Sequence, residues 1–147
     1  MASQKLKDLM NKGLASEIQV TIQYMWQHVQ WIGVEHYAVS EQFKEIAIQE
    51  MKHAEKIAER LWYLDGVPTT KPAPIQVGGE MWEMVDYDIT AEQQAIDLYK
   101  EIMEVAMKEG DPTTRFIFEK ILEEEEEHHD FFASLKQGQP KKTSRAK

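Results

Sequence analysis

The chain has 147 residues, of which 42% are hydrophobic, and this length allows one domain with its own buried core. Its net charge of -9 argues against nucleic acid as the main partner and favours cationic ligands. The absence of cysteine excludes disulfides, thiolate zinc sites and iron–sulfur clusters. No apolar run approaches the roughly 20 residues that span a bilayer, and the N-terminus lacks the apolar core of a signal peptide. We therefore expect a cytoplasmic protein with no membrane partner.

Apolar residues at helical spacing predict four helices, of which the first two fill the first half of the chain. The first runs from about Gln4 to Trp31. The second runs from about Glu35 to Leu64 and stops at Gly66 and Pro68, residues that commonly end helices. The link between them is short, so we predict an antiparallel hairpin.

The second half of the chain predicts another hairpin and a tail. The third helix runs from about Glu80 to Lys108. The fourth begins at Pro112, with Asp111 as its N-cap, and continues to about Lys136. We predict that residues 1–137 form one domain and that residues 138–147 form a basic, disordered tail.

The link between the second and third helices is long and contains three of the five prolines. Its roughly 15 residues can extend over about 50 Å, whereas a helix of about 28 residues is about 42 Å long. The link can therefore cross the whole bundle and start the third helix parallel to the second. We predict an all-α four-helix bundle with one long crossover between helices two and three.

A pattern of polar residues occurs in both halves of the chain. In the first half, Glu17 and Tyr24 lie on the first helix, and Glu50 and His53 form a Glu-x-x-His motif on the second. A chain with 26 acidic residues produces one such motif by chance, but a repeat of all four positions at one offset is far less expected. At an offset of 75 the same residue types recur as Glu92, Tyr99, Glu125 and His128.

The repeated residues occupy helix positions where an apolar side chain is expected. On the fourth helix, Glu125 and His128 continue an apolar stripe that steps by three and four residues. Glu50 and His53 do the same on the second helix, so we expect all four Glu side chains to point into the bundle. The apolar members of the stripe on the fourth helix are Phe118, Ile121, Phe132 and Leu135.

Four buried carboxylates need counter-charges. An unpaired buried carboxylate costs several kcal/mol, whereas a whole domain is stable by only about 5–15 kcal/mol. No Lys or Arg lies on these stripes. Two divalent metals would balance the four carboxylates, and the mixed oxygen and nitrogen donors suit iron or manganese better than tetrahedral zinc. The alternative is a plain helical bundle in which these residues have a structural role.

With these residues in place, the chain resembles the bacterioferritins over roughly residues 4–137. The segments EMKHAE (50–55) and ERLWYLDGVP (59–68) are similar to the second-helix signature of that family. The resemblance implies a ferritin-like fold and a ferroxidase, which oxidises Fe²⁺ with O₂ or H₂O₂. It also implies that ferric mineral is stored in a cage of identical subunits.

The resemblance also implies roles for individual residues at a site with two iron ions per subunit, where manganese is an alternative metal. Met51 would be an axial ligand for a haem between two subunits, and Tyr24 and Tyr99 would hydrogen-bond the ligating carboxylates. Glu50 and Glu125 would bridge the irons, with Glu17 and His53 completing one iron and Glu92 and His128 completing the other.

The chain departs from the bacterioferritin pattern in three ways. Without a fifth helix after the fourth, a cage of 12 subunits is favoured over one of 24. The His and Asp that some bacterioferritins use to pass electrons correspond to Glu45 and Gln49. Tyr99 has no strict bacterioferritin counterpart, and a Glu–Tyr pair in each half is similar to the rubrerythrins.

Two alternative functions follow from these observations. One is an erythrin-type peroxidase that uses the same two metals without storing mineral. The other is a DNA-protecting mini-ferritin whose basic tail contacts DNA, although a solubilising tail is favoured. The tryptophans are more numerous than a small core needs, so we expect subunit contacts at Trp26, Trp31 and Trp62.

Overall fold

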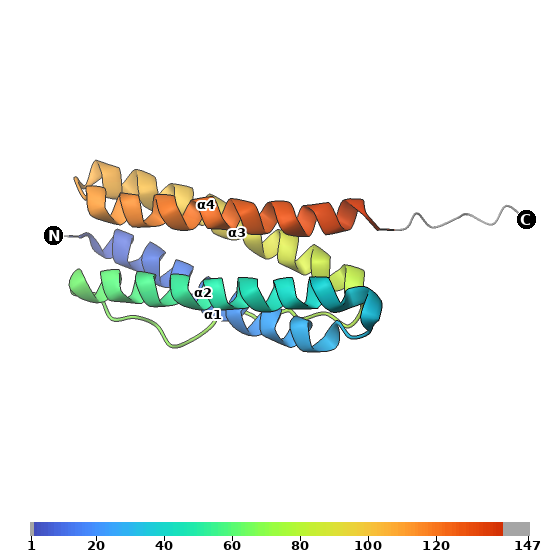
Figure 1. Ribbon diagram of the computed structural model, residues 1–147. Helices are drawn as coiled ribbons and strands as arrows, with labels where there is room; N and C mark the ends of the chain where they lie inside the picture. The colour runs from blue at the N-terminus through green and yellow to red at the C-terminus, as the bar shows by residue number, and fades with distance from the viewer. Residues whose placement is uncertain (1, 140–147) are drawn as a thin grey trace, which may run out of the picture.

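The computed structural model describes residues 2–139, and these form four long helices and no strand. Each predicted helix is present, with ends that differ by at most a few residues, so the all-α prediction is confirmed. The largest difference is at the start of the second helix, where Val34–His36 form a separate turn of 3-10 helix. The helices are α1 (Gln4–Gln30), α2 (Tyr37–Tyr63), α3 (Met81–Lys108) and α4 (Pro112–Gln137) (Figure 1).

Two antiparallel hairpins form the bundle, α1 with α2 and α3 with α4 (Figure 1). The chain leaves α2 at one end, runs back along the bundle and starts α3 at the other end, so α2 and α3 are parallel (Figure 1). This is the predicted long crossover. Among the described residues, no helix combines the length and the apolar character needed to cross a membrane.

The crossover is held against α1 by backbone and side-chain hydrogen bonds. Asn11 donates from Nδ2 to the carbonyl of Val67 at 3.0 Å and accepts from the Thr69 amide at 2.8 Å. Further along, the Ala73 amide donates to the Ala15 carbonyl at 2.9 Å. These bonds supply partners for backbone groups that no helix or sheet satisfies.

Side-chain caps fix the starts of α1, α3 and α4, as the sequence indicates for the last of these. Asp111 accepts from the Thr114 amide at 3.0 Å, and Pro112 occupies the first turn. The predicted N-cap is therefore confirmed. Arg60, near the end of α2, also binds Asp111 at 2.8 Å and so ties the two hairpins together at this end of the bundle.

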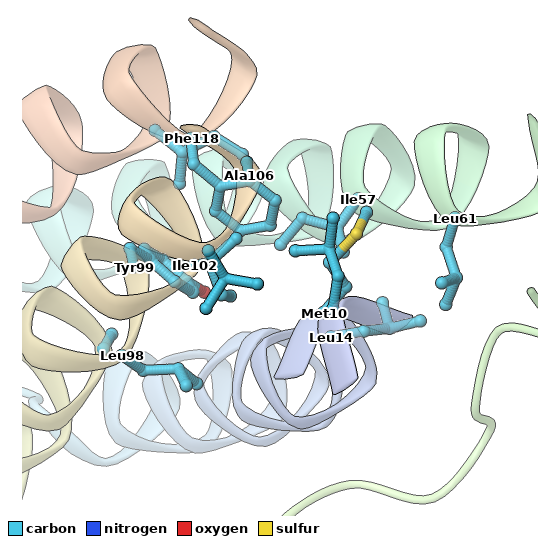
Figure 2. Close-up of a cluster of buried hydrophobic side chains, with 13 residues drawn as sticks. Met10, Leu14, Ile57, Leu61, Leu98, Tyr99, Ile102, Ala106 and Phe118 are labelled. Carbon is cyan, nitrogen blue, oxygen red and sulfur yellow. The ribbon is translucent and has the colours of Figure 1, made fainter. Parts of the chain in front are cut away.

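Two apolar clusters fill the bundle on either side of a central polar band. In the first, Met10, Leu14, Ile57 and Leu61 pack near Tyr99, Ile102 and Phe118 (Figure 2). The second cluster includes Tyr24, Trp31, Phe43, Val85 and Phe132. Along each helix, the Glu and His residues of the sequence repeat lie between members of these two clusters.

One tryptophan prediction is wrong. Trp31 is only 5% exposed, and its ring packs 5.1 Å from that of Phe43, so it is a core residue. It belongs to the core because it follows α1 directly and closes the end of the second cluster. Trp26 and Trp62 are 57% and 69% exposed, so these two remain available for subunit contacts. The predicted basic tail lies outside the described residues from position 140 onward and stays a prediction.

Candidate metal centre

Six polar side chains from all four helices meet in the middle of the bundle. Each is at most 5% exposed, because each takes an inward position that its helix otherwise gives to apolar residues. The structure therefore brings together all six residues that the sequence repeat singled out. They are Glu17 of α1, Glu50 and His53 of α2, Glu92 of α3, and Glu125 and His128 of α4.

The six residues form two overlapping groups, each able to hold one metal ion. Within each group, one ligand atom from every residue lies within 4.8 Å of all the others. Glu50 and Glu125 belong to both groups, so they lie between the two positions. The first group adds Glu17 and His53, and the second adds Glu92 and His128.

The two imidazole rings point the same nitrogen at this centre. Nδ1 of His53 lies 2.9 Å from Glu50 Oε2 and 2.9 Å from Glu125 Oε1. Nδ1 of His128 lies 3.2 Å from Glu50 Oε1. The rings are stacked with centroids 6.0 Å apart. Both rings therefore direct Nδ1 at the carboxylates and leave Nε2 for partners outside the centre.

Two buried tyrosines orient the carboxylates that are not shared. The Tyr24 hydroxyl donates to Glu92 Oε1 at 2.6 Å, and the Tyr99 hydroxyl donates to Glu17 Oε1. Each tyrosine thus binds the glutamate of the other half of the repeat. Burial raises the pKa of both tyrosines well above the usual value, so both stay neutral donors.

Burial makes full ionisation of the carboxylates unfavourable. Burial raises the pKa of Glu50 and Glu125 well above the usual value, and the nearby Glu17 charge adds to this effect. Burial and the Glu125 charge raise the pKa of Glu92 in the same way. At Glu17, contact with His53 outweighs burial, so its pKa is lowered. Three of the four carboxylates therefore need a compensating charge to ionise.

The two histidines differ in their own titration. Burial disfavours the charged form of His53, but its hydrogen bonds to Glu125, Glu17 and Glu50 outweigh burial and raise its pKa. Burial lowers the pKa of His128 to about 4, and the nearby His53 charge contributes. Neutral His128 therefore already presents a lone pair, whereas His53 must release a proton before it can bind a metal.

The donor set fits two divalent metal ions. Oε2 of Glu17 and Oε2 of Glu92 are buried and have no hydrogen-bond partner. A cation in each group would supply the missing partner, because one unshared carboxylate belongs to each group. Four carboxylates balance two divalent charges, and the imidazoles add neutral donors of the type that iron and manganese accept.

Cavities reach the centre from two sides of the bundle. Between α1 and α3, a cavity of about 480 Å³ is lined in part by Glu17, Glu92 and Glu125. Between α2 and α4, a cavity of about 300 Å³ is lined in part by His53 and three lysines. Small ions and molecules therefore have a short path to the carboxylates from α1 and α3, and to the His53 ring from α2 and α4.

A buried carboxyl group close to the centre was not predicted from the sequence. Asp88 of α3 is fully buried, and its Oδ1 accepts from Gln23 Nε2 and Gln27 Nε2, both at 2.8 Å. Burial raises the pKa of Asp88 to about 8. Its Oδ2 has no hydrogen-bond partner among the described residues, so no second hydrogen bond offsets the burial of a charge on this carboxyl group. Asp88 lies four residues before Glu92 and therefore on the same helix face, and this spacing was the sequence signal for its burial.

The same polar network also reaches the crossover. Gln23 Oε1 accepts from the Gln76 amide at 3.1 Å, and Gln27 Nε2 lies 3.0 Å from the Val77 carbonyl. Asp88 therefore holds the two glutamines that dock the last part of the crossover onto α1. This connection links the packing of the crossover to the charge of one buried carboxyl group.

Met51 lies apart from the centre, on the exposed side of α2. It is 52% exposed, although it directly follows the buried Glu50. Successive residues of a helix point to different sides, which explains this contrast. The predicted haem contact stays a prediction, and the position of Met51 is compatible with a group bound at the molecular surface.

Known proteins resemble this chain in sequence and in fold. The ferritin-like domain family matches residues 7–138. Bacterioferritins from Desulfovibrio desulfuricans and Rhodobacter capsulatus are each 33% identical over 132 residues, covering 89% and 86% of this chain and 74% and 80% of those proteins.

The structural comparisons agree with the sequence comparisons. A solved structure of the D. desulfuricans bacterioferritin, which concerns its diiron site in different catalytic states, has a TM-score of 0.83 at 32% identity. The alignment covers 89% of this chain and 77% of that one. BfrA from M. tuberculosis has a TM-score of 0.85 at 24% identity, covering 91% and 84%. By its domain match and its relatives, the chain belongs to the ferritin-like family as a homologue of the bacterioferritins.

Proposed function

We propose that this protein is a ferroxidase that oxidises Fe²⁺ to Fe³⁺ and stores the product. The observation that carries the proposal is the pair of overlapping ligand groups that share Glu50 and Glu125. The bacterioferritin relatives support it, since one of them has a diiron site described in different catalytic states. The donors, the charge balance and the two access cavities all suit two Fe²⁺ ions as substrate.

The proposed coordination follows from the same two groups. Glu50 and Glu125 bridge the metal positions, since both carboxylates belong to each group. Glu17 and His53 complete one position, and Glu92 and His128 complete the other. Manganese would accept the same donors, so the choice of iron rests on the relatives.

The residues of this chain perform three tasks in the proposed reaction. The four carboxyl groups bind Fe²⁺, and those of Glu50, Glu92 and Glu125, whose pKa is raised, release their protons as the metal charge replaces them. Tyr24 and Tyr99 hold the unshared carboxylates in place by hydrogen bonds. Each Fe²⁺ gives one electron, so two ions reduce one O₂ to H₂O₂, or one H₂O₂ to two H₂O, with two protons taken up.

Storage requires self-association, for which the surface offers apolar side chains. Trp26, Met51, Trp62 and Tyr63 are all more than half exposed, and a surface of this kind favours protein–protein contacts. We propose a homo-oligomeric cage and favour 12 subunits over 24. Native mass spectrometry of the full chain measures this number directly.

Iron loading tests the storage function. After two Fe²⁺ per subunit are oxidised, a storage protein continues to take up many more ions, and its final iron content far exceeds two per subunit. A peroxidase of the erythrin type saturates near two and shows no further uptake. Such a result would refute storage and leave the di-metal site intact.

The erythrin-type peroxidase is the second candidate because of one specific observation. Both halves of the repeat have a buried tyrosine that donates to a glutamate of the centre. Comparison of Fe²⁺ oxidation rates with O₂ and with H₂O₂ separates the two candidates, since a peroxidase strongly prefers H₂O₂.

The DNA-protecting alternative depends on the tail, which lies outside the described residues from position 140. A gel shift at physiological salt, with and without residues 138–147, tests it. Absence of a shift in both forms would refute this alternative. A haem bound through Met51 is a separate proposal, to be tested by haem titration of the protein and of Met51→Leu.

A further inference from the structure

The repeat that builds the centre is broken at one pair of positions. Gln49 directly precedes Glu50, and Glu124 directly precedes Glu125, so these two residues are equivalent at the offset of 75. Every other repeated residue in the centre keeps its type in both halves. At this pair, the first half has a neutral amide and the second half has a carboxylate.

These two residues bind the outer nitrogens of the two imidazoles. Nε2 of His53 contacts a carboxylate oxygen of Glu124, and Nε2 of His128 lies 2.5 Å from Gln49 Oε1. An amide oxygen and a carboxylate can only accept, so each ring donates from Nε2. Nδ1 of each ring is directed at the carboxylates of the centre and becomes the metal-binding nitrogen, at His53 after the proton on Nδ1 is released.

The two acceptors do not act equally on the rings. A hydrogen bond to a charged acceptor is stronger than one to a neutral acceptor, and it draws the N–H proton further from the imidazole. The ring then carries more electron density, and its other nitrogen binds a metal more tightly. Once its Nδ1 proton has been released, His53, which donates to Glu124, is therefore a stronger metal ligand than His128, which donates to Gln49.

Lysine side chains lie on the outer side of the centre, beside His53. The cavity beside the His53 ring is lined by Lys52, Lys56 and Lys120, together with Gln49 and Glu124 themselves. The lysine charges oppose a metal ion at the position of His53, but they remove neither hydrogen bond to the rings. The carboxylate of Glu124 also adds a negative charge beside one position only.

We propose that Glu124 and Gln49 make the two metal positions unequal, so that the position of Glu17 and His53 fills before the position of Glu92 and His128. This inference rests on the ligand assignment of the proposed function and adds an order of filling to it. Glu124 and Gln49 are positioning residues, because each acts on the metal only through an imidazole ring. A form with one metal ion per subunit is then a defined species.

A direct test uses Zn²⁺, which binds the same donors without redox chemistry. Crystals of the full-length protein, freed of metal by chelation, are given one Zn²⁺ per subunit, and anomalous diffraction gives the occupancy at each position. Occupancy concentrated at Glu17 and His53 supports the inference. Equal occupancy, or preference for Glu92 and His128, overturns it. If no Zn²⁺ binds at the centre, both this inference and the proposed function fail.

Exchange of the two outer residues supplies the decisive variant. Glu124→Gln alone should reduce the difference in Zn²⁺ affinity between the two positions. The double variant Gln49→Glu with Glu124→Gln should reverse the order of filling. Loss of such an outer hydrogen bond typically changes metal affinity by about 10–100-fold. A merely structural role for these two residues predicts no reversal. An unchanged order in the double variant would therefore overturn the inference.

Matched controls separate this effect from general charge and from folding. Glu126→Gln removes one negative charge from an exposed position on the same helix and should leave the order unchanged. Gln49 and Glu124 are both exposed, so the substitutions should not prevent folding. Asp88 lies four residues before Glu92 on α3, so its charge is also controlled. Because its pKa is about 8, measurement near pH 6.5 keeps it neutral.

Discussion

The hydroxyl of Tyr24 donates to Glu92 Oε1 at 2.6 Å, so a side chain of α1 holds a carboxylate of α3. The bond is completely buried, and it crosses from the first half of the repeat to the second. Tyr99 makes the reciprocal bond to Glu17. The two halves of the chain therefore complete each other's ligands, and neither hairpin alone contains the whole centre.

Removal of this bond should weaken one metal position. In Tyr24→Phe, Glu92 loses the hydroxyl that donates to it, and we expect metal affinity at the position of Glu92 and His128 to fall about 10–100-fold. The free energy of unfolding should fall by about 1–3 kcal/mol, since a buried acceptor is left unsatisfied. Co²⁺ titration by visible absorbance and urea denaturation measure the two effects.

A tyrosine nearer the surface of α3 supplies the matched control. Tyr87 donates its hydroxyl to Glu83 at 3.0 Å, also on α3, in an exposed bond. Tyr87→Phe also removes a tyrosine hydroxyl, but one outside the centre. The metal affinities of both positions should therefore stay as in the unmodified protein. If Tyr24→Phe behaves like Tyr87→Phe, the buried bond has no role in holding the ligand.

Asp88 should make stability depend on pH in a specific direction. Its pKa is about 8 in the folded protein and near 3.8 as an ordinary exposed carboxyl. The folded state therefore keeps a proton that the unfolded chain releases. Its contribution to stability is fully present below about pH 3.8 and is lost as the pH rises through 8. Between about pH 6 and pH 8, the free energy of unfolding should fall by up to about 1.4 kcal/mol per pH unit from this group.

The substitution Asp88→Asn isolates this contribution from the other buried carboxylates. The introduced amide keeps an acceptor for Gln23 and Gln27 and carries no charge at any pH. We expect the stability of the native protein relative to Asp88→Asn to decrease from about pH 6 to pH 8. Urea denaturation of both proteins measures it. A difference that does not change with pH would show that Asp88 is ionised throughout.

Glu50 should be unfavourable for folding until a metal binds. Burial and the Glu17 charge raise its pKa, so Glu50→Gln should raise the melting temperature in the presence of a chelator. The same variant should lose most of the stabilisation that Zn²⁺ gives the native protein, which is about 2.7 kcal/mol at a concentration of about 100 Kd. Differential scanning calorimetry with and without Zn²⁺ measures both effects.

The control for this pair of measurements is an exposed glutamate on the same helix. Glu55→Gln changes the same charge of α2 outside the centre and should leave the Zn²⁺ effect intact. If Glu50→Gln and Glu55→Gln respond equally to Zn²⁺, the plain structural bundle becomes the correct interpretation.

The bundle and the six central residues could be predicted because each glutamate replaces an apolar residue on an otherwise regular stripe. The energetic cost of burying four carboxylates then points to metal. The start of α2 was less predictable: Gly33 has a positive φ of 103°, and the chain turns through a short 3-10 helix before α2 begins. Spacing alone does not encode this kind of local turn.

The contacts of two functional residues could not be predicted from helical spacing alone. Glu124 lies within a run of five glutamates, and helical spacing alone does not show that its side chain reaches across to His53. Asp88 lies beside an apolar stripe, and its burial depends on Gln23 and Gln27, which are distant in sequence. In both cases the partner comes from another helix, so the contact requires the packing of the bundle.

Anaerobic addition of Fe²⁺ to the metal-free protein, followed by O₂, tests the central claim most directly. We predict that two Fe²⁺ per subunit bind before O₂ is added and are then oxidised rapidly, as followed by absorbance. In Glu50→Ala with Glu125→Ala both binding and rapid oxidation should be lost. In Glu126→Ala with Glu127→Ala, which are exposed on the same helix, both should persist. Absence of Fe²⁺ binding in the native protein, or unchanged binding in the first variant, would contradict a di-iron centre at these residues.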